Sequence, residues 1–164
     1  MFEQGLQRVV NRLNTNLSRD SLVQKTTNEL REFLQVDRVV LYYFVRQWEG
    51  RVTFESLSSS EFSIFGETGP DECFNGEYAA KYETGRIRAI PDIETEEISE
   101  CHRNFLRKHK VRANLVVPVL NNEKLWGLLI AHHCRETRFW TESDIEVMQK
   151  AAKDLEMSPA IRES

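Results

Sequence analysis

The sequence predicts an α+β fold in which helices cover both faces of an antiparallel sheet. Two pairs of consecutive strand-like segments, one pair in each half of the chain, are each joined by a short turn, which is typical of antiparallel hairpins. Segments with apolar residues at helical spacing precede, separate and follow these pairs. Because each helix must bury its apolar stripe, this order favours a sheet with helices on both sides.

The first half of the chain is expected to hold two helices, a hairpin, a third helix and an edge strand. The two opening segments carry apolar residues at helical spacing, and Asp20 or Ser18 can cap the second helix. The residues after Asp37 are rich in β-branched and aromatic types, and Trp48-Glu49-Gly50 supplies a turn between two strands. Gly85 ends the third helix. The expected ranges are helices 2–17, 22–34 and 77–84 and strands 37–46, 51–57 and 86–91.

The second half is expected to hold a helix, a hairpin and a final helix. Ile98, Cys101 and Phe105 lie along one side of the first of these helices. Asn121-Asn122 is a good tight-turn pair, and the strand after it is apolar on both faces, so we expect it to be central. Thr141 caps the last helix. The expected ranges are helices 98–110 and 141–155 and strands 113–120 and 125–133, with a loose tail over 158–164.

The composition predicts a single domain, 1–164, with its core over about residues 19–156. The chain has 164 residues, of which 40% are hydrophobic and 29% charged. A chain of this length can bury a stable hydrophobic core without help from disulfides or a structural metal. A net charge of −4 does not favour nucleic acid or an anionic membrane, and no apolar run reaches the roughly 20 residues that span a bilayer. The chain does not begin like a signal peptide. Its three cysteines are too sparse for a disulfide framework, so we expect reduced thiols and the cytoplasm.

One irregular stretch, residues 58–75, is a candidate functional loop. It is rich in serine, glycine and phenylalanine without a clean period, and loops of this length are uncommon unless they are functional. The stretch contains Asp71-Glu72-Cys73-Phe74. Asp71 could accept hydrogen bonds from N–H donors of a ligand, although a turn in which it only caps the backbone is an equal alternative.

Two further positions carry candidate chemistry. On their helix, Cys101 and Phe105 share a face, while the side chain of His102 is rotated by about 100° around the helix axis from that of Cys101. Cys101 and His102 could therefore flank a flat ligand. From helix position alone, a buried cysteine beside a surface histidine is the stronger alternative. His132 ends the central strand on the same face as Leu128, and here the alternative is a histidine satisfied by backbone or water.

Several other site types are not predicted. The sequence has no Cys-x-x-Cys or His-x-x-x-His pair of the kind that holds structural zinc, so we expect no metal site. It has no glycine-rich phosphate fingerprint and no nucleophile elbow of a Ser/His/Asp hydrolase.

Together these residues resemble the GAF domains of the cyanobacteriochromes, photosensors related to the phytochromes. The resemblance runs from about Leu22 to Leu155 and is carried by Asp71–Phe74 and Cys101-His102, a pattern similar to the Asp-x-Cys-Phe two-cysteine subgroup. It implies a GAF fold with a central antiparallel sheet of five or six strands and helices on both faces. The supporting segments are 111–119, 125–132 and 139–140.

The resemblance implies a covalently bound linear tetrapyrrole, phycocyanobilin or its isomer phycoviolobilin, between the sheet and the helix that begins near Ile98. Cys101 would form the permanent thioether to ring A, and Cys73 a second, reversible one to the C10 bridge between rings B and C. The second bond interrupts conjugation and gives a violet- or blue-absorbing state. Z/E isomerisation of the ring C–D bridge would release Cys73 and give a green-, teal- or orange-absorbing state.

The resemblance also assigns roles to other residues. Asp71 would hydrogen-bond the pyrrole nitrogens, His102 would pack against the inner rings, and His132 would lie near ring D. Phe74 would shape the bilin site and tune its colour together with Phe62 and Phe65. The residues expected at the propionates are Lys81, Tyr82 and Arg86.

The implied partners are the bilin and a signalling output domain fused to this domain in a longer protein. That full-length protein could be anchored in a membrane. A homodimer through the terminal helices is a further option. Such a domain is not an enzyme, beyond isomerising its own chromophore to phycoviolobilin. One alternative is a GAF-type reductase of free methionine sulfoxide, with Cys73 as nucleophile and Cys101 as resolving thiol. Another is a GAF signalling module without pigment that binds a small ligand such as a cyclic nucleotide.

Overall fold

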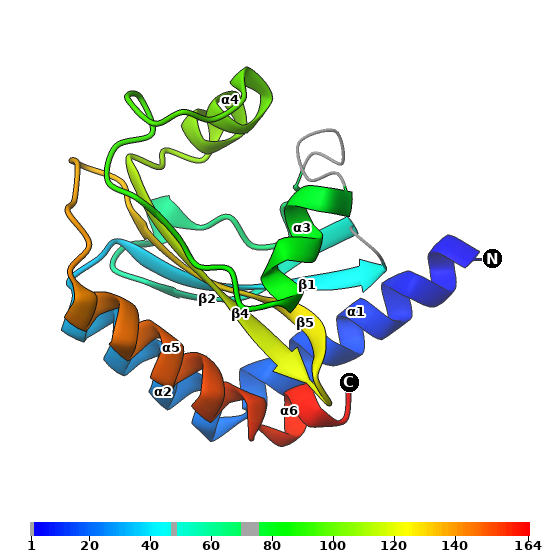
Figure 1. Ribbon diagram of the computed structural model, residues 1–164. Helices are drawn as coiled ribbons and strands as arrows, with labels where there is room; N and C mark the ends of the chain where they lie inside the picture. The colour runs from blue at the N-terminus through cyan, green and yellow to red at the C-terminus, as the bar shows by residue number, and fades with distance from the viewer. Residues whose placement is uncertain (1, 47–48, 70–75) are drawn as a thin grey trace.

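The computed structural model describes residues 2–46, 49–69 and 76–164 and forms three layers, with the sheet between two groups of helices (Figure 1). The helices are α1 (Phe2–Arg19), α2 (Ser21–Leu34), α3 (Gly76–Glu83), α4 (Glu100–Lys108), α5 (Glu142–Glu156) and α6 (Pro159–Arg162), and a 3₁₀ turn, η1, spans Ser60–Phe62. The strands are β1 (Arg38–Arg46), β2 (Glu49–Leu57), β3 (Arg88–Ile90), β4 (Ala113–Asn121) and β5 (Lys124–His133).

The five strands form one antiparallel sheet in the order β2-β1-β5-β4-β3. The expectation that β5 is central is confirmed, because it pairs with β1 on one side and β4 on the other. The short β3 lies at an edge, as the sequence predicts. The strand order brings the ends of β1, β5 and β4 side by side.

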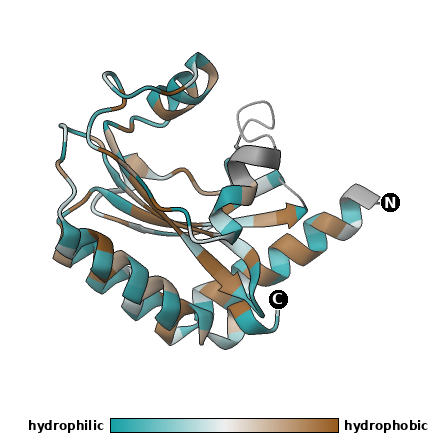
Figure 2. Cartoon of the chain, in the orientation of Figure 1, coloured by the Kyte–Doolittle hydropathy of each residue, from teal (hydrophilic) through white to brown (hydrophobic). Residues whose placement is uncertain are grey.

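The two faces of the sheet bury separate apolar clusters. On one face α1, α2, α5 and α6 pack over a large core that includes Leu17, Leu129 and Leu155, each fully buried. On the other face lie α3 and α4, with smaller clusters around Val40 and around Ile93. Figure 2 shows hydrophobic residues following the strands and the helix sides that face them. The second face is thinly covered, which leaves room for a ligand.

Local sequence signals explain where the helices begin. The Asp20 side chain accepts hydrogen bonds from the backbone N–H groups of Leu22 and Val23, at 2.9 and 3.1 Å, and so caps α2. Thr141 and Asp144 form a capping box at the start of α5. Ser99 caps α4 through the N–H of His102 at 3.1 Å, so this helix begins slightly later than the expected 98.

Both hairpin turns differ from the sequence prediction. Glu49 and Gly50, expected in the first turn, already belong to β2, where they pair with Arg46 and Phe44. The β4–β5 turn lies one residue further on than Asn121-Asn122, because Asn121 still pairs with Lys124 and the two turn residues, Asn122 and Glu123, have φ of 53° and 66°. Two positive φ values in a two-residue hairpin are the signature of a type I′ turn.

The C-terminal residues are not the loose tail that the sequence predicts, because residues 159–162 form α6. Ile161 is fully buried, Ser158 donates a hydrogen bond to the Asp20 carboxylate at 2.7 Å, and Asn121 donates to the Ile161 carbonyl at 3.1 Å. So short a helix carries no readable period, and tertiary contacts hold it in place.

Candidate functional site: a pocket between the sheet and helix α4

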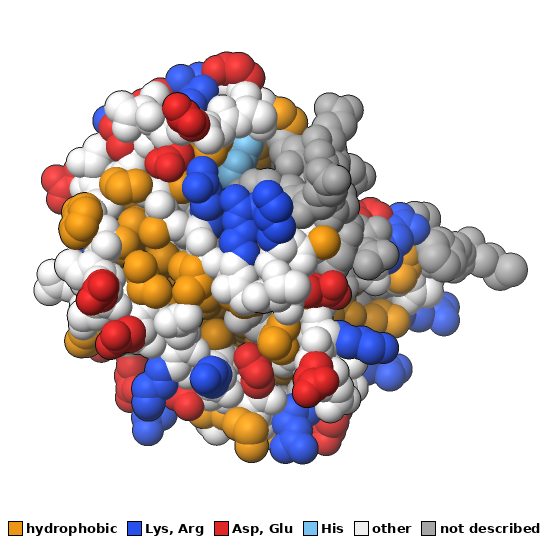
Figure 3. Space-filling view, viewed as in Figure 1, with side chains coloured by type: hydrophobic (Ala, Val, Ile, Leu, Met, Phe, Trp, Pro, Cys, Tyr) orange, Lys and Arg blue, Asp and Glu red, His pale blue; other side chains and the backbone are white. Residues whose placement is uncertain are grey.

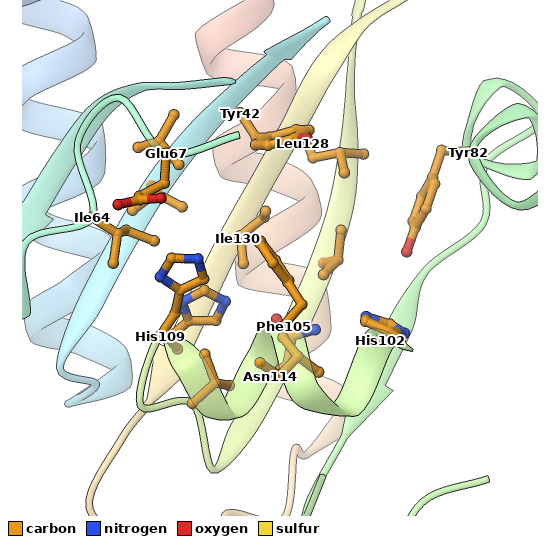
Figure 4. A pocket seen from close by; sticks show the side chains of 16 residues that line it. Tyr42, Ile64, Glu67, Tyr82, His102, Phe105, His109, Asn114, Leu128 and Ile130 are labelled. Carbon is orange, nitrogen blue, oxygen red and sulfur yellow. The ribbon is translucent and has the colours of Figure 1, made fainter. Parts of the chain in front are cut away.

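A pocket opens on the thinly covered face of the sheet, between β1, β5 and β4 on one side and α3 and α4 on the other. Figure 4 shows Tyr82, His102, Phe105 and His109 reaching from the helices toward this space. The hollow contains about 610 Å³ of empty space when the open solvent at its mouth is included. Water-sized spheres fit in only about 50 Å³ of it, which is below the roughly 300–1,000 Å³ of small-molecule sites, so the pocket must widen to admit a ligand with several rings. Its walls are mainly apolar.

Three polar side chains form a row across the sheet at one end of this pocket. His132 on β5 is the direct cross-strand partner of Arg38 on β1 and of Asn114 on β4. All three are buried, with exposed fractions of 1% for Arg38, 5% for His132 and 4% for Asn114. Arg38 donates from Nε to Nδ1 of His132 at 2.9 Å. The sheet thus places a cation, an imidazole and an amide in one line beneath the pocket.

His132 is neutral in this setting. Burial first, and then the charges of Arg38 and His109, hold the pKa of His132 well below its ordinary value of 6.5. Its Nδ1 accepts the hydrogen bond from Arg38, so the ring proton is on Nε2. His132 lies on the pocket face of β5 with Leu128, as predicted from the strand period.

Two buried polar atoms of the pocket have no hydrogen-bond partner among the described residues. They are Nε2 of His109 and Oδ1 of Asn114. Burial of an unsatisfied polar atom costs about 1–3 kcal/mol, so such atoms are uncommon without a ligand or water. Burial lowers the pKa of His109, although Glu67 opposes this shift, and the imidazole packs edge-on against Phe105 at 4.6 Å between ring centroids.

His102 lies in the first turn of α4 beside a positively charged mouth. It is 6% exposed, and burial followed by the charges of Arg88 and Arg86 lowers its pKa to about 4. Figure 3 shows Lys and Arg side chains gathered next to a histidine on this face. The Arg86 guanidinium lies 5.6 Å from the centre of the Tyr82 ring, and Arg88 is 3.7 Å from the Glu96 carboxylate. The mouth therefore suits an anionic group.

The structure brings together part of the set that the sequence predicts. His102, His132 and Tyr82 all line the pocket, and Tyr82 is 1% exposed. Lys81 is exposed on the last turn of α3 and does not line the pocket. Cys101 is half-buried next to His102 and is disulfide-bonded, so the expectation of reduced thiols is wrong for this residue.

The other predicted positions are not placed in the pocket. Asp71, Cys73 and Phe74 lie outside the described residues. Phe62 is buried in η1, where its carbonyl accepts a hydrogen bond from Arg38. Cys134 is a free thiol just beyond β5, and burial raises its pKa. Within the described ranges, no group of His, Cys, Asp and Glu residues could hold a metal ion.

Sequence reasoning missed four residues of this site: Arg38, Arg88, His109 and Asn114. For Arg38 a signal existed, because the period of β1 puts it on the same face as Val40 and Tyr42, and a charged residue on that face needs a reason. His109 and Asn114 gave no signal of their own. Their role depends on the pairing of strands and on the position of α4.

The family model of the GAF domain matches residues 18–158. The chain belongs to the GAF family. The expected GAF fold is confirmed, since solved GAF domains superpose on most of this chain. The blue-light-absorbing form of the Thermosynechococcus elongatus PixJ GAF domain is 36% identical with a TM-score of 0.75, covering 88% of this chain and 87% of that one. A phycocyanobilin-bound GAF domain from a cyanobacterial phytochrome is 27% identical with a TM-score of 0.76, covering 97% and 94%.

Curated relatives of this GAF domain include several cyanobacterial proteins. An uncharacterized protein of Picosynechococcus sp. is 50% identical, over 94% of this chain and 95% of that protein. In Synechocystis sp., a putative methyl-accepting chemotaxis protein is 34% identical over 88% of this chain, and the circadian input-output histidine kinase CikA is 32% identical over 85%. The match spans only 14% and 22% of these two longer proteins. No helix in the described part of the chain is long and apolar enough to cross a membrane.

Proposed function

We propose that this GAF domain is a photosensor that binds a linear tetrapyrrole in the pocket between the sheet and α4. The observation that carries the proposal is the 36% identity, over 88% of the chain, to a GAF domain solved in a blue-light-absorbing form. The resemblance to the Asp-x-Cys-Phe cyanobacteriochromes adds the two cysteine motifs, 71–74 and 101–102. A bilin supplies a conjugated system that absorbs visible light and isomerises at one bridge. The protein residues bind it, hold its rings and set its colour.

The chemistry of the pocket fits such a ligand. Its apolar walls and aromatic side chains suit flat pyrrole rings, while the cations Arg86 and Arg88, whose charges act on His102, suit the two propionates. Arg88 joins Lys81, Tyr82 and Arg86 as a propionate candidate because it lies beside His102. His102 would pack against the inner rings as a neutral imidazole.

The far end of the pocket fits a terminal lactam, which presents a carbonyl acceptor next to an N–H donor. His132 offers an Nε2–H donor and Asn114 an unsatisfied Oδ1 acceptor, from directly opposite positions on β5 and β4. Cβ atoms of such cross-strand partners are about 5 Å apart, so both can reach one group. This pair supports the placement of ring D near His132.

Cys101 is proposed to hold the pigment permanently. Its reduced thiol adds across a carbon–carbon double bond of the ring A side chain: sulfur bonds to one carbon, the proton goes to the other, and no oxidant is needed. Since Cys101 is disulfide-bonded in this structure, the attachment requires reducing conditions. The cytoplasm, where we place the domain, provides them.

Cys73 is proposed to make the second, reversible bond. Its thiolate adds to the C10 bridge and a ring nitrogen takes up a proton, which shortens the conjugated system and gives the violet- or blue-absorbing state. Loss of the thiolate and the proton restores the longer-wavelength state. Asp71 would bind the pyrrole N–H groups, and Phe74 would shape the site. Phycocyanobilin and phycoviolobilin are both candidate pigments.

We further propose that the domain works within a longer signalling protein, as the matched segments of the chemotaxis protein and CikA do. A light-driven change in the pocket would then pass to a fused output domain. Contact between two copies through the terminal helices remains a prediction.

The deciding experiment is to produce the protein, with a reductant present, in cells that also make phycocyanobilin. We expect coloured protein, zinc-enhanced fluorescence of the denatured chain, and reversible absorption changes under alternating blue and longer-wavelength light. A colourless protein from cells that load a known bilin domain would contradict the proposal. Assays of methionine sulfoxide reduction and of cyclic nucleotide binding would then test the two alternatives.

A further inference from the structure

We propose that Arg38 is a positioning residue that fixes His132 as a neutral imidazole with its Nε2–H directed into the pocket, so that His132 is a permanent hydrogen-bond donor. This role of Arg38 exists in the protein without a ligand. It rests on the proposed function only for the identity of the ligand carbonyl that accepts the hydrogen bond from Nε2–H of His132. The nearest alternative is that Arg38 only fills space at the end of β1.

The geometry assigns the ring proton. The Nε of an arginine always carries hydrogen and never accepts, so the 2.9 Å contact to Nδ1 of His132 requires a bare nitrogen there. A neutral imidazole has one proton, which must then be on Nε2. Because His132 lines the pocket and Nδ1 is taken, Nε2 is the nitrogen left for a ligand.

The orientation of Arg38 is itself fixed. Its Nη1 donates to the Phe62 carbonyl at 2.6 Å, its Nη2 donates to the His109 carbonyl, and the residue is 1% exposed. These contacts tie the guanidinium to η1 and to the end of α4. With all three nitrogens engaged, Arg38 cannot turn away from His132 without breaking bonds to two other elements.

The charges around His132 act in the same direction. Arg38 from β1 and His109 from α4 both disfavour a charged imidazole. The acidic groups nearby act through other partners: Glu67 on His109, and Glu55, Asp37 and the Cys134 thiol on Arg38. None of these acids pairs with His132 in the described part of the chain. Burial and the two neighbouring basic groups therefore all favour a neutral ring.

The test is NMR of the ring nitrogens of His132 in the ligand-free protein. We expect the Nε2–H tautomer at pH 8, with no protonation of His132 down to pH 5. The Nδ1–H tautomer, or protonation with a midpoint near 6.5, would overturn the proposal. This measurement needs no pigment, so its outcome is independent of the proposed function.

Variants separate positioning from packing. In Arg38→Gln the cation is lost, and we expect the pKa of His132 to rise relative to the wild type, although burial still holds it below its ordinary value. Arg138→Gln is the matched control, because Arg138 also donates to a backbone carbonyl, that of Leu34, but its charge does not act on His132; it should leave His132 unchanged. If Arg38→Gln does not fold, the wild-type titration still decides. A folded Arg38→Gln protein in which neither the tautomer nor the pKa of His132 changes would contradict the assignment.

Pigment-loaded protein gives a second readout. The longer-wavelength absorption maximum of the wild type should stay constant between pH 8 and 5.5, whereas that of Arg38→Gln should shift with the protonation of His132. A variant spectrum as independent of pH as that of the wild type, alongside a titrating His132, would show that Nε2 does not contact the pigment and would overturn the donor role. Failure of the wild type to bind pigment would count against the proposed function alone.

Discussion

Gly127 on β5 packs so closely against β1 that a Cβ atom at this position would lie 2.1 Å from the backbone oxygen of Tyr42. No side chain can occupy that space, so glycine is required for the two central strands to approach. Tyr42 in turn lines the pocket, and its hydroxyl accepts a hydrogen bond from the N–H of Gly69 at 2.9 Å. The contact between Gly127 and Tyr42 therefore supports the last described residue before the Asp71–Phe74 motif.

Replacing this glycine should destabilise the domain. We expect Gly127→Ala to lower the free energy of unfolding by about 1–3 kcal/mol or more, because overpacking against backbone cannot be relieved by a rotamer change. The control is Gly5→Ala in α1, where a Cβ meets nothing within 4 Å and a helix-favouring residue should add about 0.5–1 kcal/mol. Urea denaturation measures both. Equal stability of the two variants would show that the strands can separate to admit a methyl group.

The domain should become less stable as the pH is lowered below about 6.5. His102, His109 and His132 are buried and have lowered pKa values, so the unfolded chain binds more protons than the folded one between the unfolded value of 6.5 and the folded values, about 4 for His102. The free energy of unfolding is therefore highest above pH 6.5 and decreases as the pH drops toward 4. The decrease due to His102 alone is about 3 kcal/mol. Thermal unfolding from pH 8 to 4.5 measures the effect. A flat profile would mean that these rings are hydrated or protonated in the folded protein.

Much of the fold could be predicted because its signals are local. Caps such as Asp20 and Thr141, the β-branched strands and the apolar stripes specify the elements, and the period of β5 correctly placed His132 on the face of Leu128. The α6 helix could not be predicted in this way, since its stability comes from contacts such as Ser158 with Asp20, which are far apart in the sequence.

The site was predictable only in part, for the same reason. Histidines next to a cysteine or at a strand end attract notice in a sequence, as His102 and His132 did. Arg38 and Asn114 gain their roles from being cross-strand partners of His132, which requires the order β1-β5-β4. The family resemblance assigned Lys81, Tyr82 and Arg86 to the propionates; the structure adds Arg88, whose charge acts on His102.

Arg88 should matter both for the charge state of His102 and for an anionic ligand. In Arg88→Gln the pKa of His102 should rise above about 4, because a nearby cation is lost, and the yield of bound pigment should fall as a propionate partner disappears. Arg112→Gln is the control: Arg112 is paired with Asp92 at 2.9 Å, and its charge is not one of those that lower the pKa of His102. NMR titration of His102 and the ratio of pigment to protein absorbance are the measurements. Pigment loading equal to that of the control would assign the propionates to other residues.

Cys101→Ala should abolish permanent attachment. Without this thiol no thioether forms to ring A, so any pigment that enters the pocket should be removed by acidic denaturing solvent. Cys134→Ala is the control, since Cys134 is a free thiol at the end of β5 with a raised pKa, and it should retain covalent pigment. Zinc-enhanced fluorescence of the denatured chain distinguishes the two. Pigment that stays bound to a chain lacking both Cys73 and Cys101 would show that another residue forms the attachment.

Cys73→Ala should change the colour of the protein without releasing the pigment. The Cys73 bond is proposed to form and break in each photocycle, so its loss should remove the violet- or blue-absorbing state and leave a longer conjugated system in both states, still attached at Cys101. Alkylating accessible thiols of the wild type during illumination, when Cys73 is free, should also block return to the blue form. Cys134→Ala protein treated in the same way separates this effect from modification of the third cysteine. If Cys73→Ala keeps a blue-absorbing state, the residues 71–74 are not the chromophore motif that their sequence resembles.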